Sequence, residues 1–263
     1  MTNHNPLTLN QIITGNALEV LRSWPDNCID HCIADPPFNI SKTKGLEWAF
    51  SSHVTMQEQW DRFTEDDFFL FNNDWLREVV RVVKPNGNII VFGTYHNIYQ
   101  IGYILKNKLN RRLLNSITWY KPNAQPNITA RMLTESTEQI IWAVNGTPEG
   151  KNKARKWTFN YWDAKKLNGG KQMRNLWEIP VTSKSERGKG KHPSQKPLVL
   201  MERLVLLGTQ EGNLILDPFG GAGTLAIAAE KHHRNWILIE TVESYIEIAK
   251  ARIAEQRMSS LKD

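Results

Sequence analysis

The stretch Asn213-Leu-Ile-Leu-Asp-Pro-Phe-Gly-Gly-Ala-Gly-Thr224 decides the fold of this 263-residue chain. It predicts an apolar strand, then a glycine-rich turn, then a helix, and open α/β sheets bind their ligands at such turns. The glycines let the backbone approach a ligand closely, and a helix N-terminus offers free N–H groups. Neither the phosphate loop, GxxxxGK followed by Ser or Thr, nor the dinucleotide fingerprint GxGxxG fits this stretch.

The next apolar run ends in an acidic residue, Trp236-Ile-Leu-Ile-Glu240. A carboxylate at the end of the strand after a glycine turn is placed to accept hydrogen bonds from ribose hydroxyls. Together the two features predict an adenosine-bearing ligand without a pyrophosphate. The alternative is that the glycines and Glu240 serve tight packing alone.

Strand and helix signals alternate on both sides of this core. Strands are predicted at Gln11–Thr14, Ile29–Ala34, Asn88–Phe92, Asn115–Tyr120, Glu138–Val144, Leu214–Leu216 and Trp236–Ile239. Helices are predicted at Ala17–Trp24, Asn72–Val83, Ile98–Leu109, Leu198–Leu207, Gly223–Lys231 and Glu243–Gln256. The alternation predicts an α/β fold with a doubly wound, mostly parallel sheet and helices on both faces.

The alternation breaks down between residues 145 and 191, where Lys, Arg, Gly and Asn are interleaved with aromatic residues. From Lys151 to Lys196 there are 13 Lys and Arg residues against three acids, a local net charge of +10 in a chain whose total is +6. Such asymmetry favours a nucleic-acid-binding face. We therefore divide the chain into residues 1–144, a basic insertion at 145–191, and residues 192–263.

Composition limits the other function classes. An apolar fraction of 40% in a chain of this length is typical of a globular domain, and no stretch is apolar for the ~18 residues of a membrane span. Cys28 and Cys32 form neither a CxxC motif nor a zinc site, and we expect reduced thiols and no metal. The polar start Met1–Asn10 lacks the pattern of a secretory signal, so we expect a cytoplasmic protein.

A second candidate site follows the apolar run Ile29–Ala34. Asp35-Pro36-Pro37-Phe38 must leave the sheet, because prolines cannot continue a ladder. The Asp35 carboxylate and a carbonyl fixed by proline can accept two hydrogen bonds from an NH2 group, and the ring of Phe38 can stack on a planar base. The simpler alternative is a proline-rich turn.

Taken together, these motifs resemble those of the amino-methyltransferases that modify adenine N6 or cytosine N4 in DNA. The resemblance rests on four motifs, which are Gly15-Asn-Ala-Leu-Glu-Val-Leu21, Asp35-Pro36-Pro37-Phe38, His192-Pro-Ser-Gln-Lys-Pro197 and Asp217-Pro-Phe-Gly-Gly-Ala-Gly-Thr224. Their order, catalytic before cofactor-binding with a basic segment between, is that of the family's circularly permuted β class. The chain departs at Asn16, where Asp is usual, and at Phe38, where Tyr is commoner.

The resemblance implies S-adenosyl-L-methionine (AdoMet) as cofactor and a class I, Rossmann-like methyltransferase fold. Its motifs place the methionine end of AdoMet at Asp217, Phe219, Gly221, Gly223 and Thr224. Glu240 is expected at the ribose, Asn16 at the adenine and Lys196 at the AdoMet carboxylate. Asp35, besides its catalytic role, is also expected among the cofactor-binding residues. For Lys196 the alternative is a solvent-exposed lysine at a helix start.

In the same family Asp35 and the Pro36 carbonyl hold the target amino group beside Pro37 and Phe38. The base must leave the duplex stack for its amino group to meet the methyl donor. Asp at the head of the tetrapeptide favours adenine N6, with cytosine N4 as the alternative. Methylation at cytosine C5 is rejected because neither Cys28 nor Cys32 follows a proline. Asp35 also argues against the protein-glutamine enzymes, and the intact motifs argue against a silent nucleic-acid-binding module.

Double-stranded DNA is the expected partner, and residues 145–191 are the expected target-recognition segment. The candidate contacts in this segment are Arg155, Lys156, Arg174, Lys184, Arg187 and Lys189, for each of which a solvated surface charge is the alternative. Ser41–Thr64 is read either as a loop that closes on the flipped base or as a plain surface excursion. The sequence leaves open a cognate restriction endonuclease as partner and a homodimer as assembly.

Overall fold

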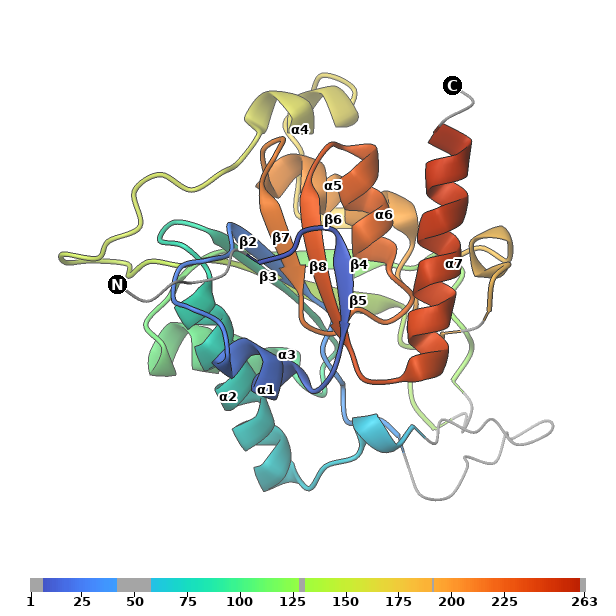
Figure 1. The fold of residues 1–263 in the computed structure, drawn as a ribbon, viewed down its shortest axis with the longest axis horizontal. Coiled ribbons are helices and arrows are strands. Elements are labelled where there is room, and N and C mark those ends of the chain that lie inside the picture. Colours follow the sequence, from blue (N-terminus) through green and yellow to red (C-terminus); the bar gives the residue numbers. More distant parts are fainter. Residues whose placement is uncertain (1–6, 42–57, 128–130, 191, 261–263) are drawn as a thin grey trace.

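The structure, a computed structural model, describes residues 7–41, 58–127, 131–190 and 192–260. Eight strands form one sheet in the order β1-β8-β7-β2-β3-β5-β4-β6 (Figure 1). Their bounds are β1 Gln11–Thr14, β2 His31–Ala34, β3 Asn88–Gly93, β4 Arg112–Tyr120, β5 Thr137–Val144, β6 Leu176–Glu178, β7 Leu214–Asp217 and β8 Asn235–Glu240.

The sheet is mostly parallel, as predicted. Strands β1, β8, β7, β2 and β3 run parallel to their neighbours, and β6 runs parallel to β4. Only β5 is antiparallel, to β3 on one side and to β4 on the other. Hence the carboxyl ends of all strands except β5 lie at one edge, which we call the carboxyl edge. The opposite edge is the amino edge.

Helices cover both faces of the sheet, which confirms the doubly wound prediction (Figure 1). Their bounds are α1 Ala17–Arg22, α2 Glu65–Val82, α3 Ile98–Tyr103, α4 Tyr161–Leu167, α5 Leu198–Gly208, α6 Thr224–Lys231 and α7 Glu243–Ser260. Two hydrophobic clusters result, one between the sheet and α4, α5 and α6, the other between the sheet and α1, α2 and α3. Burial on both faces explains why β2, β3 and β7 are continuous apolar runs without polar alternation.

Two of the predicted helices differ from those observed. Helix α2 begins at Glu65, because Thr64 caps it by accepting from the N–H of Asp67 and its first turn is acidic. That polar turn has no apolar periodicity to reveal it. Helix α3 continues as a π-helix, η2, over Ile104–Lys108. Two 3-10 turns also occur, η1 at Gln59–Asp61 and η3 at Ser185–Arg187.

The basic segment contains two regular elements, α4 and β6, that the sequence pattern did not predict. Strand β6 extends the sheet at β4, and its central Trp177 is buried beneath the guanidinium of Arg203. Helix α4 is fixed to the end of α5 by the Asn160 side chain, which donates to the carbonyls of Leu206 and Thr209. Elements of three and seven residues are too short to show a hydrophobic period, so only packing reveals them.

No helix among the described residues combines the length and apolar character needed to cross a bilayer.

Candidate active site

The strand order brings the two predicted motifs together. Strands β2 and β7 are parallel neighbours, with Cys32 beside Leu216, although they lie far apart in the sequence. Asp35 and Asp217 therefore leave the sheet side by side at the carboxyl edge. This is the position at which α/β sheets bind ligands, where strands from the two halves of the chain meet.

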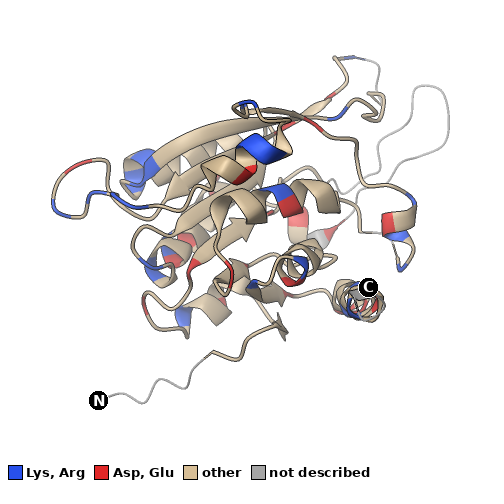
Figure 2. Cartoon of the chain, turned by 90° about the horizontal axis from the view of Figure 1, so that it is seen from above, with Lys and Arg blue, Asp and Glu red and all other residues tan. Residues whose placement is uncertain are grey.

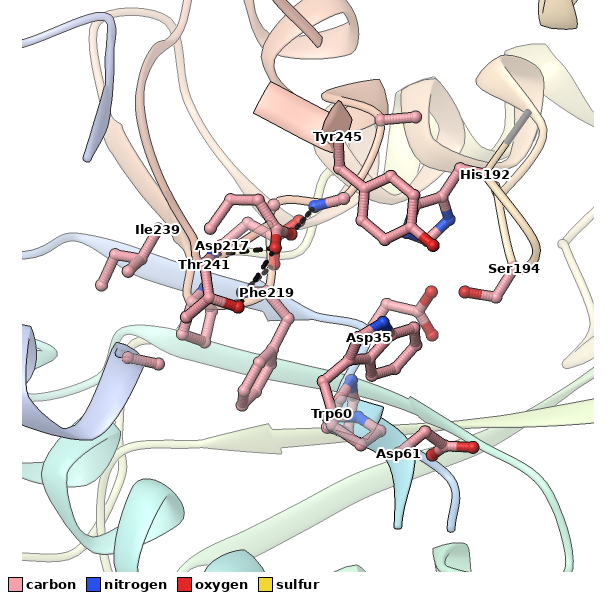
Figure 3. Close-up of a pocket in the computed structure, with 18 of the residues that line it drawn as sticks. Asp35, Trp60, Asp61, His192, Ser194, Asp217, Phe219, Ile239, Thr241 and Tyr245 are labelled. Carbon is pink, nitrogen blue, oxygen red and sulfur yellow. Dashed lines mark hydrogen bonds between the residues drawn. The ribbon is translucent and has the colours of Figure 1, made fainter. Parts of the chain in front are cut away.

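A cavity of about 360 Å³ opens at this point (Figure 3). Its wall includes Asn16, the tetrapeptide Asp35–Phe38, Lys196, Asp217, Phe219, Gly221, Thr224 and Glu240. Gly223 is the only predicted catalytic or cofactor residue that does not line it among the described residues. The wall also contains residues to which sequence reasoning gave no individual role, among them Trp60, Asp61, His192, Ser194 and Tyr245.

Asp35 is mostly buried, with 14% of its side chain exposed, and is bound to a lysine. Its Oδ2 accepts a hydrogen bond from Lys196 Nζ at 2.6 Å, and the same Nζ lies 3.4 Å from Glu138 Oε2 on β5. The Lys196 ammonium also lies 5.1 Å from the centre of the Phe38 ring. The side chain is only 4% exposed, so the alternative of a solvent-exposed lysine is wrong. The other oxygen of Asp35, Oδ1, is buried without a hydrogen-bond partner among the described residues.

Burial raises the pKa of the Asp35 carboxyl to about 6; the positive charge of Lys196 opposes this rise and the negative charge of Glu138 adds to it. For Lys196, burial lowers the pKa, but the charges of Asp35 and Glu138 outweigh burial and the net pKa is raised. At neutral pH the ammonium is charged and Asp35 is mostly ionised. Asp35 therefore keeps one unpaired carboxylate oxygen, Oδ1, just beneath the cavity wall.

Two glycines shape the turn after β7. Gly221 and Gly223 have φ of 48° and 74°, a left-handed conformation that other residues rarely adopt. A Cβ on Gly221 would lie 3.1 Å from the His192 ring, and one on Gly223 would lie 2.9 Å from Ala249. Gly223 is thus needed for packing against α7, which is the simpler of the two explanations offered for these glycines. Gly221 serves both packing and the cavity wall.

The Glu240 carboxylate joins the glycine turn to the end of β8. Its Oε2 accepts from the N–H of Gly221 at 2.8 Å, and its Oε1 accepts from the N–H groups of Thr241 and Val242 (Figure 3). Asn16 lies nearby, where its side chain caps α1 by accepting from Leu18 and Glu19. Burial raises the pKa of Asp217 to about 8, and the charges of Asp35 and Glu240 add to the rise. The Asp217 carboxyl is therefore mostly protonated at neutral pH when the cavity is empty.

Aromatic rings line the other end of the cavity. The rings of Trp60 and His192 are stacked with centroids 6.4 Å apart, and Tyr245 meets His192 edge-on at 4.3 Å (Figure 3). Burial, together with the charges of Lys196 and Arg252, lowers the pKa of His192 to about 4, so this imidazole is neutral. Its Nδ1 is buried without a partner among the described residues.

The candidate DNA contacts do not lie together. The N–H of Arg155 donates to the side chain of Asn86, just before β3, so Arg155 and Lys156 lie at the amino edge. In Figure 2, which looks onto that edge, blue segments mark the projecting loop before α4. Since β3 is six residues long, about 20 Å separate the two edges.

The other candidates lie nearer the cavity or between the edges. Turn η3, with Lys184 and Arg187 at its ends, is tied to the cavity wall because Gln195 Nε2 donates to the Glu186 carbonyl. Lys189 forms an ion pair with Glu255 of α7 at 3.2 Å. Arg174 lies just before β6, beside the middle of β4. Most of the loop proposed to close on the base, residues 42–57, lies outside the described residues.

Comparison with known proteins agrees with this geometry. The sequence matches the family described as DNA methylase (N6_N4_Mtase) over residues 29–251. The chain belongs to the N6/N4 DNA methylases. This methylase is 40% identical over 246 residues to the type II methyltransferase M2.MboI of Moraxella bovis, a match that covers 93% of this chain and 87% of the relative.

A second relative is the type II methyltransferase M2.DpnII of Streptococcus pneumoniae, 37% identical over 244 residues, covering 92% of this methylase and 88% of the relative. Among solved structures the M1.HpyAVI–SAM complex superposes with a TM-score of 0.67 at 28% identity, covering 92% of this chain and 98% of that one. These matches confirm the recognised family and the methyltransferase type of α/β fold.

Proposed function

We propose that this DNA methylase transfers a methyl group from AdoMet to the exocyclic N6 of an adenine flipped out of duplex DNA. The observation that carries the proposal is Asp35. It lies at the carboxyl edge, ionised by Lys196 and with one buried oxygen free, in the cavity that the glycine turn also lines. An unpaired carboxylate oxygen is the acceptor that the amino group of a base requires, and a small displacement of the cavity wall brings the two into contact.

AdoMet is the cofactor, and the cavity fits it. A volume of about 360 Å³ is within the range of about 300–1,000 Å³ typical of ligand pockets. The carboxyl groups of Asp217, Glu240 and Asp35 line one side, and a ligand with a sulfonium and an ammonium group would favour the ionised form of Asp217, whose pKa burial raises to about 8. When bound, AdoMet supplies a methyl group on a positively charged sulfur. We assign the methionine end to Asp217, Phe219, Gly221 and Thr224, with Gly223 supporting the turn, the ribose to Glu240, and the adenine to Asn16.

The residues of the chain orient the acceptor. Asp35 Oδ1 and the Pro36 carbonyl each accept one hydrogen of the target NH2, and the ring of Phe38 stacks on the base beside Pro37. Two acceptors on one NH2 draw its lone pair out of conjugation with the ring and direct it towards the donor. The contribution of the protein is therefore positioning and electrostatics.

In the structure, Lys196 binds Asp35. Its ammonium holds Oδ2, keeps the carboxyl ionised and leaves Oδ1 to the substrate. The AdoMet carboxylate remains a predicted second partner of Lys196. Among the described residues, the ammonium of Lys196 binds Asp35.

For DNA, we propose that Lys184, Arg187 and Lys189 contact phosphates of the duplex whose base enters the cavity. Three further residues remain predicted phosphate contacts, namely Arg155, Lys156 and Arg174. Because Arg155 and Lys156 lie at the amino edge, they can contact only DNA that reaches this edge. Both relatives named above are type II methyltransferases. By extension, we infer a cognate restriction endonuclease as partner. A homodimer remains the predicted assembly, and the cytoplasm remains the predicted compartment.

Nucleoside analysis tests the target atom. DNA methylated by the purified protein with labelled AdoMet is digested and its nucleosides are identified by mass spectrometry. We expect N6-methyldeoxyadenosine. N4-methyldeoxycytidine in its place would overturn adenine as the target while leaving the fold, the cofactor and the Asp35 chemistry intact. No methylated nucleoside with a folded, AdoMet-binding protein would favour the silent nucleic-acid-binding module.

A further inference from the structure

One buried carboxylate outside the recognised motifs lies against the catalytic tetrapeptide. Asp61 in η1 is 2% exposed and lies more than twenty residues after Asp35. Its Oδ1 accepts from the N–H groups of Phe38 and Asn39 at 2.7 and 2.6 Å. Its Oδ2 accepts from those of Ile40 and Ser41, both at 2.9 Å. Four successive backbone N–H groups therefore point at one side chain.

This arrangement, which we call the Asp61 turn (Phe38–Ser41 with the carboxylate of Asp61), is an anion nest whose anion belongs to the protein. Successive N–H groups in such turns form concavities that bind negative charge. Asn39 adopts the left-handed conformation, with φ of 60°, that curls the chain around the carboxylate. The Asn39 side chain in turn accepts from the N–H of Phe63 at 2.9 Å, so the two segments hold each other reciprocally.

The Asp61 turn begins at Phe38, the last residue of the tetrapeptide. The N–H of Phe38 is bound directly, so the direction in which its ring and the preceding Pro37 leave β2 depends on Asp61. Asp35, at the other end of the tetrapeptide, is held by Lys196. A weaker third contact joins Asn97 Nδ2 to the Pro37 carbonyl at 3.4 Å. The tetrapeptide is thus fixed at both ends by charged side chains from other elements.

We propose that Asp61 is the positioning residue of the catalytic tetrapeptide, setting the orientation of Pro36, Pro37 and Phe38 at the cavity wall. The inference rests on the proposed function, in which these residues hold the target base. Asp61 makes no contact with the reacting atoms in this assignment and acts through the backbone of Phe38–Ser41. A displacement of about 1 Å at a reacting group is enough to cost about a hundredfold in rate.

The test uses three variants of the full chain. Asp61→Asn keeps the shape but turns an NH2 group towards two N–H donors, Asp61→Ala empties the nest, and Asp66→Asn removes an exposed acid as the matched control. For each we measure transferred label per enzyme, KM for DNA, the AdoMet dissociation constant by equilibrium dialysis, and the thermal midpoint. The count of transferred label does not depend on which base is methylated, so the outcome is separable from that of the adenine assignment.

We expect kcat of Asp61→Asn to fall about tenfold to a hundredfold, with AdoMet affinity within about twofold of the parent. We expect formate to restore kcat of Asp61→Ala in a saturable way, since it can occupy the nest, while chloride at equal ionic strength does not. Native kcat in Asp61→Asn would overturn the proposal. So would equal losses of AdoMet affinity, thermal midpoint and kcat without rescue by formate, because Asp61 would then serve only the stability of the domain.

Discussion

The charged side chains at the carboxyl edge and at the amino edge of the sheet differ in sign and in burial. At the carboxyl edge Asp61 and Asp217 are buried and Asp35 is mostly buried, all three lie in one cavity wall, and Lys196 is a buried cation beside Asp35. At the amino edge the charges are exposed and mostly basic, along the loop before α4 and on α4 itself (Figure 2). The two regions are about 20 Å apart along β3.

The contrast shows how differently buried and exposed charges contribute. A buried carboxylate has few partners and a perturbed pKa, and each of its hydrogen bonds is fixed, so it is suited to hold a reacting group. An exposed lysine is screened by salt and contributes to long-range attraction of a polyanion. The charge count of the basic segment therefore predicted a DNA-binding face without specifying which edge faces the DNA.

Removal of the catalytic carboxylate tests the contrast most strongly. We expect Asp35→Ala to reduce methyl transfer by at least about a hundredfold, because the target NH2 loses its charged acceptor. AdoMet binding should survive, since the glycine turn is unchanged. Asp163→Ala, which removes an exposed acid at the amino edge, is the matched control and should retain full activity. Labelled transfer and equilibrium dialysis measure both quantities, and near-native turnover of Asp35→Ala would refute the assignment.

Paired removal of exposed lysines and arginines locates the DNA. Lys184→Ala with Lys189→Ala removes two charges that flank η3, the turn tied to the cavity wall, and Arg155→Ala with Lys156→Ala removes two at the amino edge. On a short duplex we expect the first pair to lower the log–log salt slope of binding by about 0.9 for each lost phosphate contact. We expect the second pair to leave the slope unchanged. The reverse result would mean that the duplex lies along the amino edge, and AdoMet affinity should stay constant in both.

The fall of activity at low pH tests how the charges next to Asp35 set its pKa. The reaction needs its carboxylate form, so kcat/KM, which reports the pKa values of the free enzyme, should fall as the pH falls through about 6, the pKa of Asp35. Lys196 lowers this pKa and Glu138 raises it. Hence Lys196→Met should move the acid limb to higher pH, and Glu138→Gln should move it to lower pH. Shifts of the same sign in the two variants would show that Lys196 and Glu138 do not control the pKa of Asp35.

The smallest expected effect is on stability alone. Asn88, at the amino edge, is fully buried and donates to the carbonyls of Thr158 and Gly208. Asn88→Ala leaves both carbonyls without this donor and should lower the free energy of unfolding by about 1–3 kcal/mol. Activity per folded molecule should be unchanged because the cavity lies at the other edge. Urea denaturation and active-site titration measure the two quantities. A fall in kcat would show that packing at the amino edge affects the cavity at the carboxyl edge.

Much of the fold and of the cofactor side of the site is predictable from the sequence. The strand–turn–helix around Asp217, the acid at Glu240 and the tetrapeptide at Asp35 are local patterns, and local patterns follow from backbone conformation and hydrophobic period. Their order along the chain indicated the permuted β class. Short or polar-ended elements, such as β6 and the first turn of α2, have no such period and were missed.

The remaining features depend on which strands are neighbours. Lys196 reaches Asp35, and Glu138 reaches Lys196, only because the segment before α5 and the start of the antiparallel strand β5 both lie at the carboxyl edge, where β2 ends. Asp61 reaches Phe38 only because η1 folds back against the same turn. The sequence by itself determined which side chains carry the chemistry, since residue type and spacing are written locally. Tertiary structure alone decided their partners and the edge at which each charge lies, since contacts between distant residues depend on strand order and register, and composition records neither.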